Sequence, residues 1–166
     1  MKSEDITFMR LALAAAQQAA DEGEVPVGAI VAYGETVVGR GYNRREVSQS
    51  PLGHAEISAL DQASRHFGSW RLSECTIYVT LEPCIMCMGV MLQARIGRLV
   101  FGCLDAKAGA VESLYRLCED HRLNHQIPTT GGVLASQAAA MLAAFFQRLR
   151  EQKRNAKKSG EVAESG

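Results

Sequence analysis

Neither sign of charge is in excess in this sequence, because 18 Lys and Arg residues balance 18 Asp and Glu residues. A protein that coats nucleic acid by charge alone is strongly basic, so any contact with nucleic acid must be local. Hydrophobic residues make up 47% and charged residues 22% of the 166-residue chain, which is the composition of a folded globular protein. This length predicts one domain rather than two.

Long apolar runs are also missing. The longest such run in the N-terminal region is residues 11–16, whereas a membrane span needs about 20 apolar residues and a signal peptide a core of about 7–15. Glu4 and Asp5 further oppose the basic start of a signal peptide. We therefore expect a cytoplasmic protein without a membrane partner.

Cysteine is present in an odd number, which does not suit a disulfide framework. The five residues are Cys75, Cys84, Cys87, Cys103 and Cys118. In a reducing compartment, closely spaced cysteines more often bind a metal or take part in catalysis.

Hydrophobic periodicity predicts strands that alternate with helices. The expected helices are residues 3–23, 54–67, 83–94, 111–118 and 135–154. The expected strands are residues 27–33 and 36–42, which form a hairpin, then 76–81 and 98–102. Residues 43–53 and 121–132 are expected to be loops, the second with room for a brief strand. This order predicts a mixed sheet covered by helices on both faces, with residues 1–155 as the domain and 156–166 as a flexible tail.

Three residues in two motifs point to a metal site. His54 opens an expected helix, and Cys84 and Cys87 lie three residues apart at the start of another, where their sulfurs share one face. Zinc binds imidazole nitrogen and thiolate sulfur, and the positive end of a helix dipole favours thiolates. If the two helices flank the same edge of the sheet, the three ligands converge on one point.

Three protein ligands are typical of a catalytic zinc, which keeps a fourth position for water and lowers the pKa of that water to about 7. Glu56 lies two residues after His54, and helical rotation points it away from the imidazole. It is therefore better placed as a general acid and base beside the water than as a fourth ligand.

Other interpretations of these residues remain open. Cys84-x-x-Cys87 could be a redox pair, although the sequence lacks a thioredoxin-like context. It could also belong to a structural zinc site closed by Cys75, Cys103 or a second histidine. The other histidines, His66, His121 and His125, suit the surface better than a metal site.

His-x-Glu followed by Pro-Cys-x-x-Cys is the pattern of zinc-dependent nucleobase deaminases. Beyond that motif, the chain resembles the bacterial tRNA-specific adenosine deaminase family from about residue 5 to residue 155. The resemblance lies in separate blocks at residues 24–29, 41–44, 54–57, 80–87, 95–102, 105–110 and 145–150.

The resemblance implies a cytidine-deaminase-like fold, a three-layer α/β/α sandwich around a five-stranded mixed sheet. It implies hydrolytic conversion of adenosine to inosine at the wobble position of a tRNA anticodon, by a homodimer with one Zn²⁺ per subunit. By matching positions, His54, Cys84 and Cys87 are the metal ligands and Glu56 carries the protons. The implied substrate contacts are Asn43, beside the flipped nucleotide, Ala55, against the base, and Asp105, in a loop near the anticodon.

The motif alone does not distinguish a tRNA deaminase from a deaminase of free nucleobases or nucleosides, such as guanine or cytosine. A zinc-stabilised RNA-binding module without turnover is a third hypothesis. Asn43 could equally be a turn residue at the end of the hairpin. RNA contact is favoured by Arg44-Arg45 and by residues 148–158, which hold six basic residues and one acid, although such a run also suits a solvated helix end.

Overall fold

The structure is a computed structural model that describes residues 3–163, with side-chain surroundings described as far as residue 158. Four helices lie in this range, namely α1 (Ser3–Asp21), α2 (Ala55–Phe67), α3 (Ile85–Gln93) and α4 (Ala135–Ala163). Five strands form one sheet, namely β1 (Gly28–Tyr33), β2 (Thr36–Tyr42), β3 (Cys75–Leu81), β4 (Arg98–Cys103) and β5 (Thr129–Thr130). Within the same residues, no helix is both long and apolar enough to cross a membrane.

The sheet is mixed, as the sequence predicted. Its strand order is β2-β1-β3-β4-β5. Strand β1 runs antiparallel to β2 and β3, whereas β3, β4 and β5 run parallel to one another. The chain order of the parallel strands places α3 between β3 and β4, as a crossover helix must lie.

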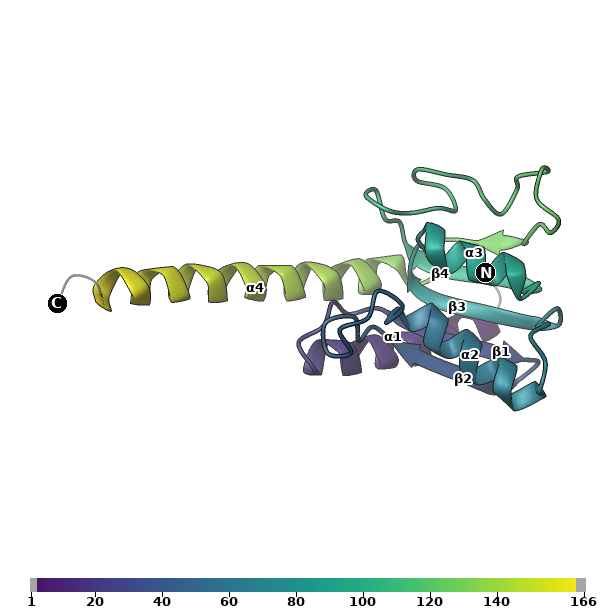
Figure 1. Ribbon diagram of the computed structural model, residues 1–166, viewed down its shortest axis with the longest axis horizontal. Helices are drawn as coiled ribbons and strands as arrows, with labels where there is room; N and C mark the ends of the chain where they lie inside the picture. Colours follow the sequence, from purple (N-terminus) through teal and green to yellow (C-terminus); the bar gives the residue numbers. More distant parts are fainter. Residues whose placement is uncertain (1–2, 164–166) are drawn as a thin grey trace.

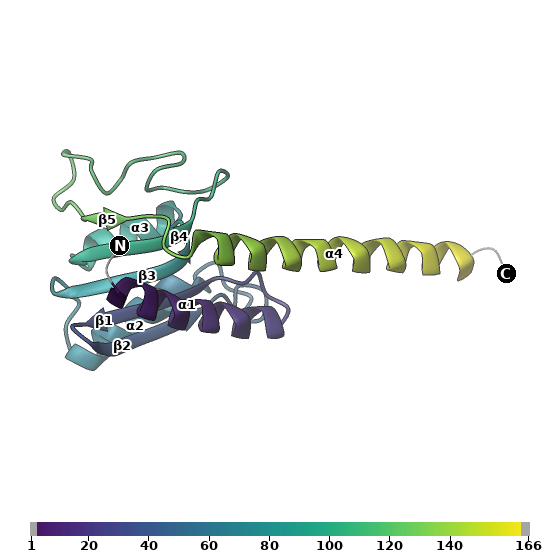
Figure 2. The ribbon, with the colours of Figure 1, turned by 180° about the vertical axis from the view of Figure 1, so that it is seen from behind.

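Alternating side chains divide the core into two layers, because successive residues of a strand face opposite sides. One layer holds Ile77, Val79, Leu99 and Phe101 with side chains of α2 and α3. The other holds side chains of α1 with Ile30, Tyr78 and Val100. Figure 1 shows α2 and α3 in front of the sheet, and Figure 2, seen from behind, shows α1 on the opposite face. The predicted three-layer sandwich is therefore confirmed.

A close approach between β2 and α2 sets the start of that helix. A Cβ atom at Gly41 would overlap the main-chain carbonyl oxygen of Ala55, so glycine is required for this contact. Ala55 is itself fully buried. The edge of the sheet therefore fixes the first turn of α2, where His54 and Glu56 lie.

The expected helix at residues 111–118 is wrong. The structure has turns there, because the backbone amides of Val111, Glu112 and Ser113 donate to the side chain of Glu82 instead of to carbonyls one helical turn earlier. The brief strand expected within residues 121–132 is confirmed by β5.

Helix α4 extends further than predicted. The sequence predicts an end at residue 154, but the structure continues the helix to Ala163, because Ala156, Lys157 and Lys158 are good helix formers and no proline interrupts the segment. Much of α4 projects away from the sheet (Figure 1). Of the predicted tail, residues 164–166 lie outside the described part, and flexibility of the tail stays a prediction.

Candidate active site

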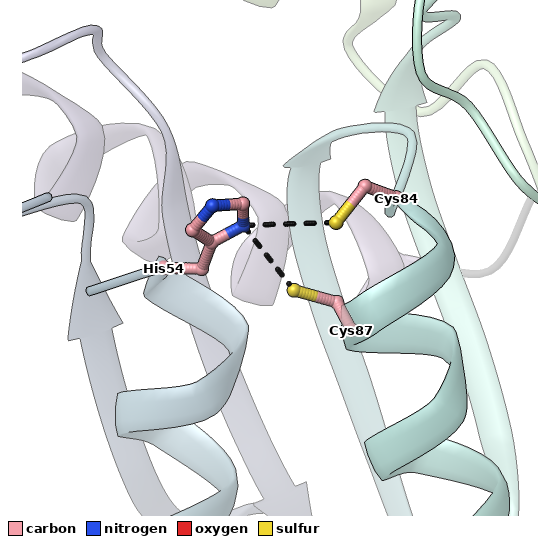
Figure 3. Close-up of side chains that lie close together, drawn as sticks. All are labelled: His54, Cys84 and Cys87. Atoms are coloured by element: carbon pink, nitrogen blue, oxygen red, sulfur yellow. Dashed lines mark hydrogen bonds between the residues drawn. The ribbon is translucent and has the colours of Figure 1, made fainter. Parts of the chain in front are cut away.

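His54 and Cys84 each occupy the N-cap position of a helix, α2 and α3 respectively. Both have extended backbone, with φ −85° and ψ 146° at His54 and φ −78° and ψ 173° at Cys84. Neither side chain caps its own helix, so each is free to face the other. Cys87 lies in the first turn of α3 and is buried. The three side chains converge from the two helices in Figure 3.

The distances within this group fit a zinc ion. Nδ1 of His54 lies 3.7 Å from Sγ of Cys84 and 3.5 Å from Sγ of Cys87. A tetrahedral zinc bonded at about 2.3 Å to sulfur and about 2.0–2.1 Å to nitrogen separates such ligand atoms by roughly 3.5 Å. Among the described residues, no fourth Cys, His, Asp or Glu joins the group, which disfavours a closed structural site.

The surroundings of the two cysteine sulfurs shift their pKa values in opposite directions. A hydrogen bond from the Cys87 thiol, reinforced by His54, lowers the pKa of Cys84 to about 3. The same hydrogen bond raises the pKa of Cys87 above its ordinary value, and burial adds to the effect. A lowered pKa favours the thiolate form of Cys84, which is the form that binds zinc.

Glu56 lies in the first turn of α2 with its side chain almost completely buried, at 4% exposure. Burial raises the pKa of its carboxyl above the ordinary value. A carboxyl whose pKa lies closer to neutrality can both accept and return a proton, as a general acid and base must. Its position on the site matches the prediction.

A cavity of about 220 Å³ opens beside His54, Cys84 and Cys87, which form the candidate metal-binding group. This volume is below the roughly 300–1,000 Å³ typical of drug-sized ligands, so it suits a single small ring system. All three predicted substrate contacts, Asn43, Ala55 and Asp105, line it. The remaining lining residues are Val25, Val27, Arg45, His54, Glu56, Leu81, Glu82, Cys84 and Ala108.

Asn43 also organises the end of the hairpin. Its Nδ2 donates to the carbonyl of Val25 at 3.1 Å, and its Oδ1 accepts from the amide of Arg45 at 3.2 Å. The turn interpretation of Asn43 is therefore confirmed, and it is compatible with a position on the cavity. An amide has two N–H donors and two acceptor lone pairs, so one of each remains for a ligand.

Sequence reasoning missed two buried carboxylates that hold the loops around the cavity. Glu24 accepts a hydrogen bond from the amide of Val47 at 2.7 Å, and Glu82 accepts several from residues 105–113. Hydrogen bonds from Glu112, Ser113 and Asp105 outweigh the effect of burial and lower the pKa of Glu82 to about 2. One sequence feature could have identified these two carboxylates. Each acidic residue stands next to Pro or to an apolar strand, in Glu24-Val25-Pro26 and Leu81-Glu82-Pro83.

The fold and the site define a deaminase. A family model described as MafB19-like deaminase matches residues 3–150. A tRNA-specific adenosine deaminase of Bacillus subtilis is 40% identical over 157 residues, which cover 95% of this chain and 98% of the relative. A tRNA-specific adenosine deaminase of Haemophilus influenzae is 44% identical over 151 residues, which cover 90% and 87%. The chain belongs to the tRNA-specific adenosine deaminase family.

Solved structures agree with this assignment. A structure from a study of A-to-I editing by tRNA:A34 deaminases at the wobble position superposes with a TM-score of 0.79 and is 38% identical. The match covers 82% of this chain and 99% of that chain. A guanine deaminase of Nitrosomonas europaea has a TM-score of 0.72 at 22% identity, over 84% and 83% of the two chains. At 22% identity, the similarity to the guanine deaminase shows a shared fold and nothing more.

Proposed function

We propose that this chain is a zinc-dependent tRNA deaminase that hydrolyses adenosine to inosine at the wobble position of an anticodon. The main support is the group of His54, Cys84 and Cys87 beside a buried Glu56, in a chain about 40% identical to tRNA-specific adenosine deaminases. The net reaction consumes one water molecule and releases one ammonia molecule.

His54 would hold the zinc through Nδ1, and Cys84 and Cys87 through their sulfurs, because these atoms already face one another. When bound, zinc supplies a Lewis acid that makes water a stronger acid and a better nucleophile at neutral pH. Glu56 accepts the proton of the attacking water, which adds to C6 of adenine. The Glu56 carboxyl delivers this proton to the ring nitrogen. It then takes the proton of the new C6 hydroxyl and passes it to the departing amino group, which leaves as ammonia.

The cavity walls suit one flipped base. Ala55 is small and fully buried, so it lets a flat ring approach the first turn of α2. Asn43 offers its remaining donor and acceptor to the polar edge of the nucleotide. Asp105 also lines the cavity, and we expect its loop to contact the neighbouring nucleotides. A base in an anticodon loop is already partly unstacked, which lowers the cost of turning it into such a cavity.

The charge for RNA binding is local, since the chain as a whole is neutral. Arg45 lines the cavity itself. Helix α4 projects from the sheet (Figure 2). Its C-terminal part carries the exposed basic residues Arg148, Arg150, Lys153, Arg154, Lys157 and Lys158. We propose that these cations contact phosphates of the stem while the loop enters the cavity.

The family resemblance further supports a cytoplasmic homodimer with one Zn²⁺ per subunit. It also supports residues 1–155 as the deaminase domain and 156–166 as its tail. Light scattering of the purified protein, together with metal analysis, tests the stoichiometry. A particle of twice the 18.0 kDa chain mass with one zinc per chain is the expected result.

The function is tested by incubating the zinc-loaded protein with an anticodon stem-loop that carries adenosine at the wobble position. Free adenosine, free guanine and free cytosine are the comparison substrates. We expect inosine in the stem-loop and no comparable ammonia release from the free compounds. Rapid release of ammonia from guanine or cytosine would instead establish the free-nucleobase alternative. Binding of the stem-loop without inosine formation would indicate the RNA-binding module.

A further inference from the structure

Glu82 is only 2% exposed, and its carboxylate accepts five hydrogen bonds from one loop. It accepts hydrogen bonds from the backbone amides of Asp105 at 2.9 Å, Val111 at 3.0 Å, Glu112 at 2.7 Å and Ser113 at 2.9 Å. The hydroxyl of Ser113 donates a fifth. All five partners are donors, and they span residues 105–113.

These contacts exclude Glu82 from proton transfer. An ionised carboxylate offers about four lone-pair sites, and the five donors of the loop occupy them. No acceptor capacity is left for a substrate or a water molecule. Glu82 and Glu56 both line the cavity, yet only Glu56 is suited to carry protons.

The loop that Glu82 holds is a wall of the cavity and also lies against a metal ligand. Asp105 and Ala108 line the cavity. Gly109 pairs with Cys84 in an isolated antiparallel bridge. A Cβ atom on Gly109 would overlap the Glu82 carboxylate, so the loop closes directly onto that group.

We propose that Glu82 is a positioning residue for substrate binding: by holding residues 105–113, it fixes the wall formed by Asp105 and Ala108 against the entering base. The inference rests on the function proposed above, because it assigns this wall to the substrate. A glutamine of the same shape cannot replace the carboxylate, since its NH₂ group would face backbone N–H donors.

The first test needs neither zinc loading nor substrate. Hydrogen exchange of backbone amides is compared between the wild-type protein, Glu82→Gln and the control Glu119→Gln, with the β3 amides as an internal reference. Glu119 is exposed and pairs with Arg116, so its substitution removes the same charge outside the cavity. We expect exchange at residues 105–113 to accelerate in Glu82→Gln alone, and by a larger factor than in β3, whose amides report the global stability. Unchanged exchange at residues 105–113, or an equal acceleration at β3, would contradict the proposal that Glu82 holds this loop.

The second test measures kinetics on the anticodon stem-loop. In Glu82→Gln, KM should rise about tenfold, as expected when one charge-assisted hydrogen bond is replaced by a clash of donors. Because the chemistry uses other groups, kcat should stay within about twofold and the zinc content should not change. Ser113→Ala, which removes only the hydroxyl contact, should shift KM in the same direction by less.

A fall in kcat without a rise in KM would overturn the proposal, because it would place Glu82 in the chemical step. Equal kinetics in Glu82→Gln and the wild-type protein would also overturn it. The wild-type reaction tests the proposed function separately: if the wild type makes no inosine, that function fails, while the exchange measurement still decides whether Glu82 holds the loop.

Discussion

Asp5 at the start of α1 binds Arg98 at the start of β4 through two parallel hydrogen bonds. The distances are 2.7 Å from Nη1 to Oδ1 and 3.0 Å from Nη2 to Oδ2. Asp5 is fully buried, and the side chain of Arg98 is 22% exposed. Arg98 also donates to Thr130 Oγ1 at 2.9 Å, so this pair joins the first helix to the two parallel strands at the far edge of the sheet.

Asp5→Asn should therefore destabilise the protein by about 3 kcal/mol, because breaking a buried ion pair leaves a charge without its partner. Urea denaturation measures the loss. Asp61→Asn is the matched control, since Asp61 also pairs with an arginine, Arg65, but on the surface. Exposed pairs contribute little, so that variant should stay close to the wild type. Similar losses in both variants would contradict this account.

Glu56→Gln should abolish most of the activity without removing the metal. The loss of a general acid and base costs about 10²–10⁴-fold in rate. Inosine formation on the stem-loop and zinc content are measured on the same preparation. Retention of wild-type activity would remove Glu56 from the mechanism. Loss of zinc would show that Glu56 supports the metal site instead.

Cys87→Ala should lose zinc, because only two ligands of the group remain. Cys75→Ala is the control, since Cys75 is equally buried but lies in β3 outside the metal-binding group. Metal analysis after dialysis compares the two, and the control should keep one zinc per chain. A Cys87→Ala protein that still binds zinc at full stoichiometry would contradict the ligand assignment.

Acid should weaken the fold partly through Glu82. Hydrogen bonds lower its pKa from 4.5 to about 2, so the folded state favours the ionised form. This contribution is complete above the unfolded value of 4.5, declines as the pH falls, and is lost near pH 2. The shift corresponds to about 3 kcal/mol. The stability difference between the wild type and Glu82→Gln should therefore shrink between pH 5 and pH 2. A difference independent of pH would refute the prediction.

The basic part of α4 should control RNA affinity through salt. Replacing Lys153, Arg154 and Lys157 by Gln removes three exposed cations. If each contacts a phosphate, the slope of log affinity against log salt should become shallower by about 2–3, since each phosphate contact contributes roughly 0.7 in single strands and roughly 0.9 in a duplex. Binding of a fluorescent stem-loop at several salt concentrations measures it. An unchanged slope would mean that this end of α4 is only a solvated helix.

The metal-binding group was predictable because it depends on short motifs. His-x-Glu and Cys-x-x-Cys each place their residues within one helical turn, and the alternation of strands and helices indicated that both helices flank one sheet. Ile77, Tyr78 and Val79 likewise show the period of two that the sandwich requires. Local sequence sets these features, and the structure agrees with it.

The role of Glu82 was not predictable, because its partners lie 23 to 31 residues further along the chain. The same long-range contacts explain the wrong helix at residues 111–118, since side-chain oxygen atoms replaced the carbonyls on which a helix depends. Hydrophobic periodicity indicates helices and strands, whose backbone hydrogen bonds follow a regular local pattern. It does not indicate that a side chain distant in the sequence, such as Glu82, will accept those hydrogen bonds instead.

The proposed metal ligands lie at the starts of two helices that rest on the sheet, whereas much of the cavity wall comes from connecting segments held by Glu24 and Glu82. The residues proposed to hold the metal and the residues that shape the cavity therefore lie in different segments of the chain. Substitutions at Asp105 or Ala108 should therefore change which nucleobase is accepted without displacing His54, Cys84 and Cys87.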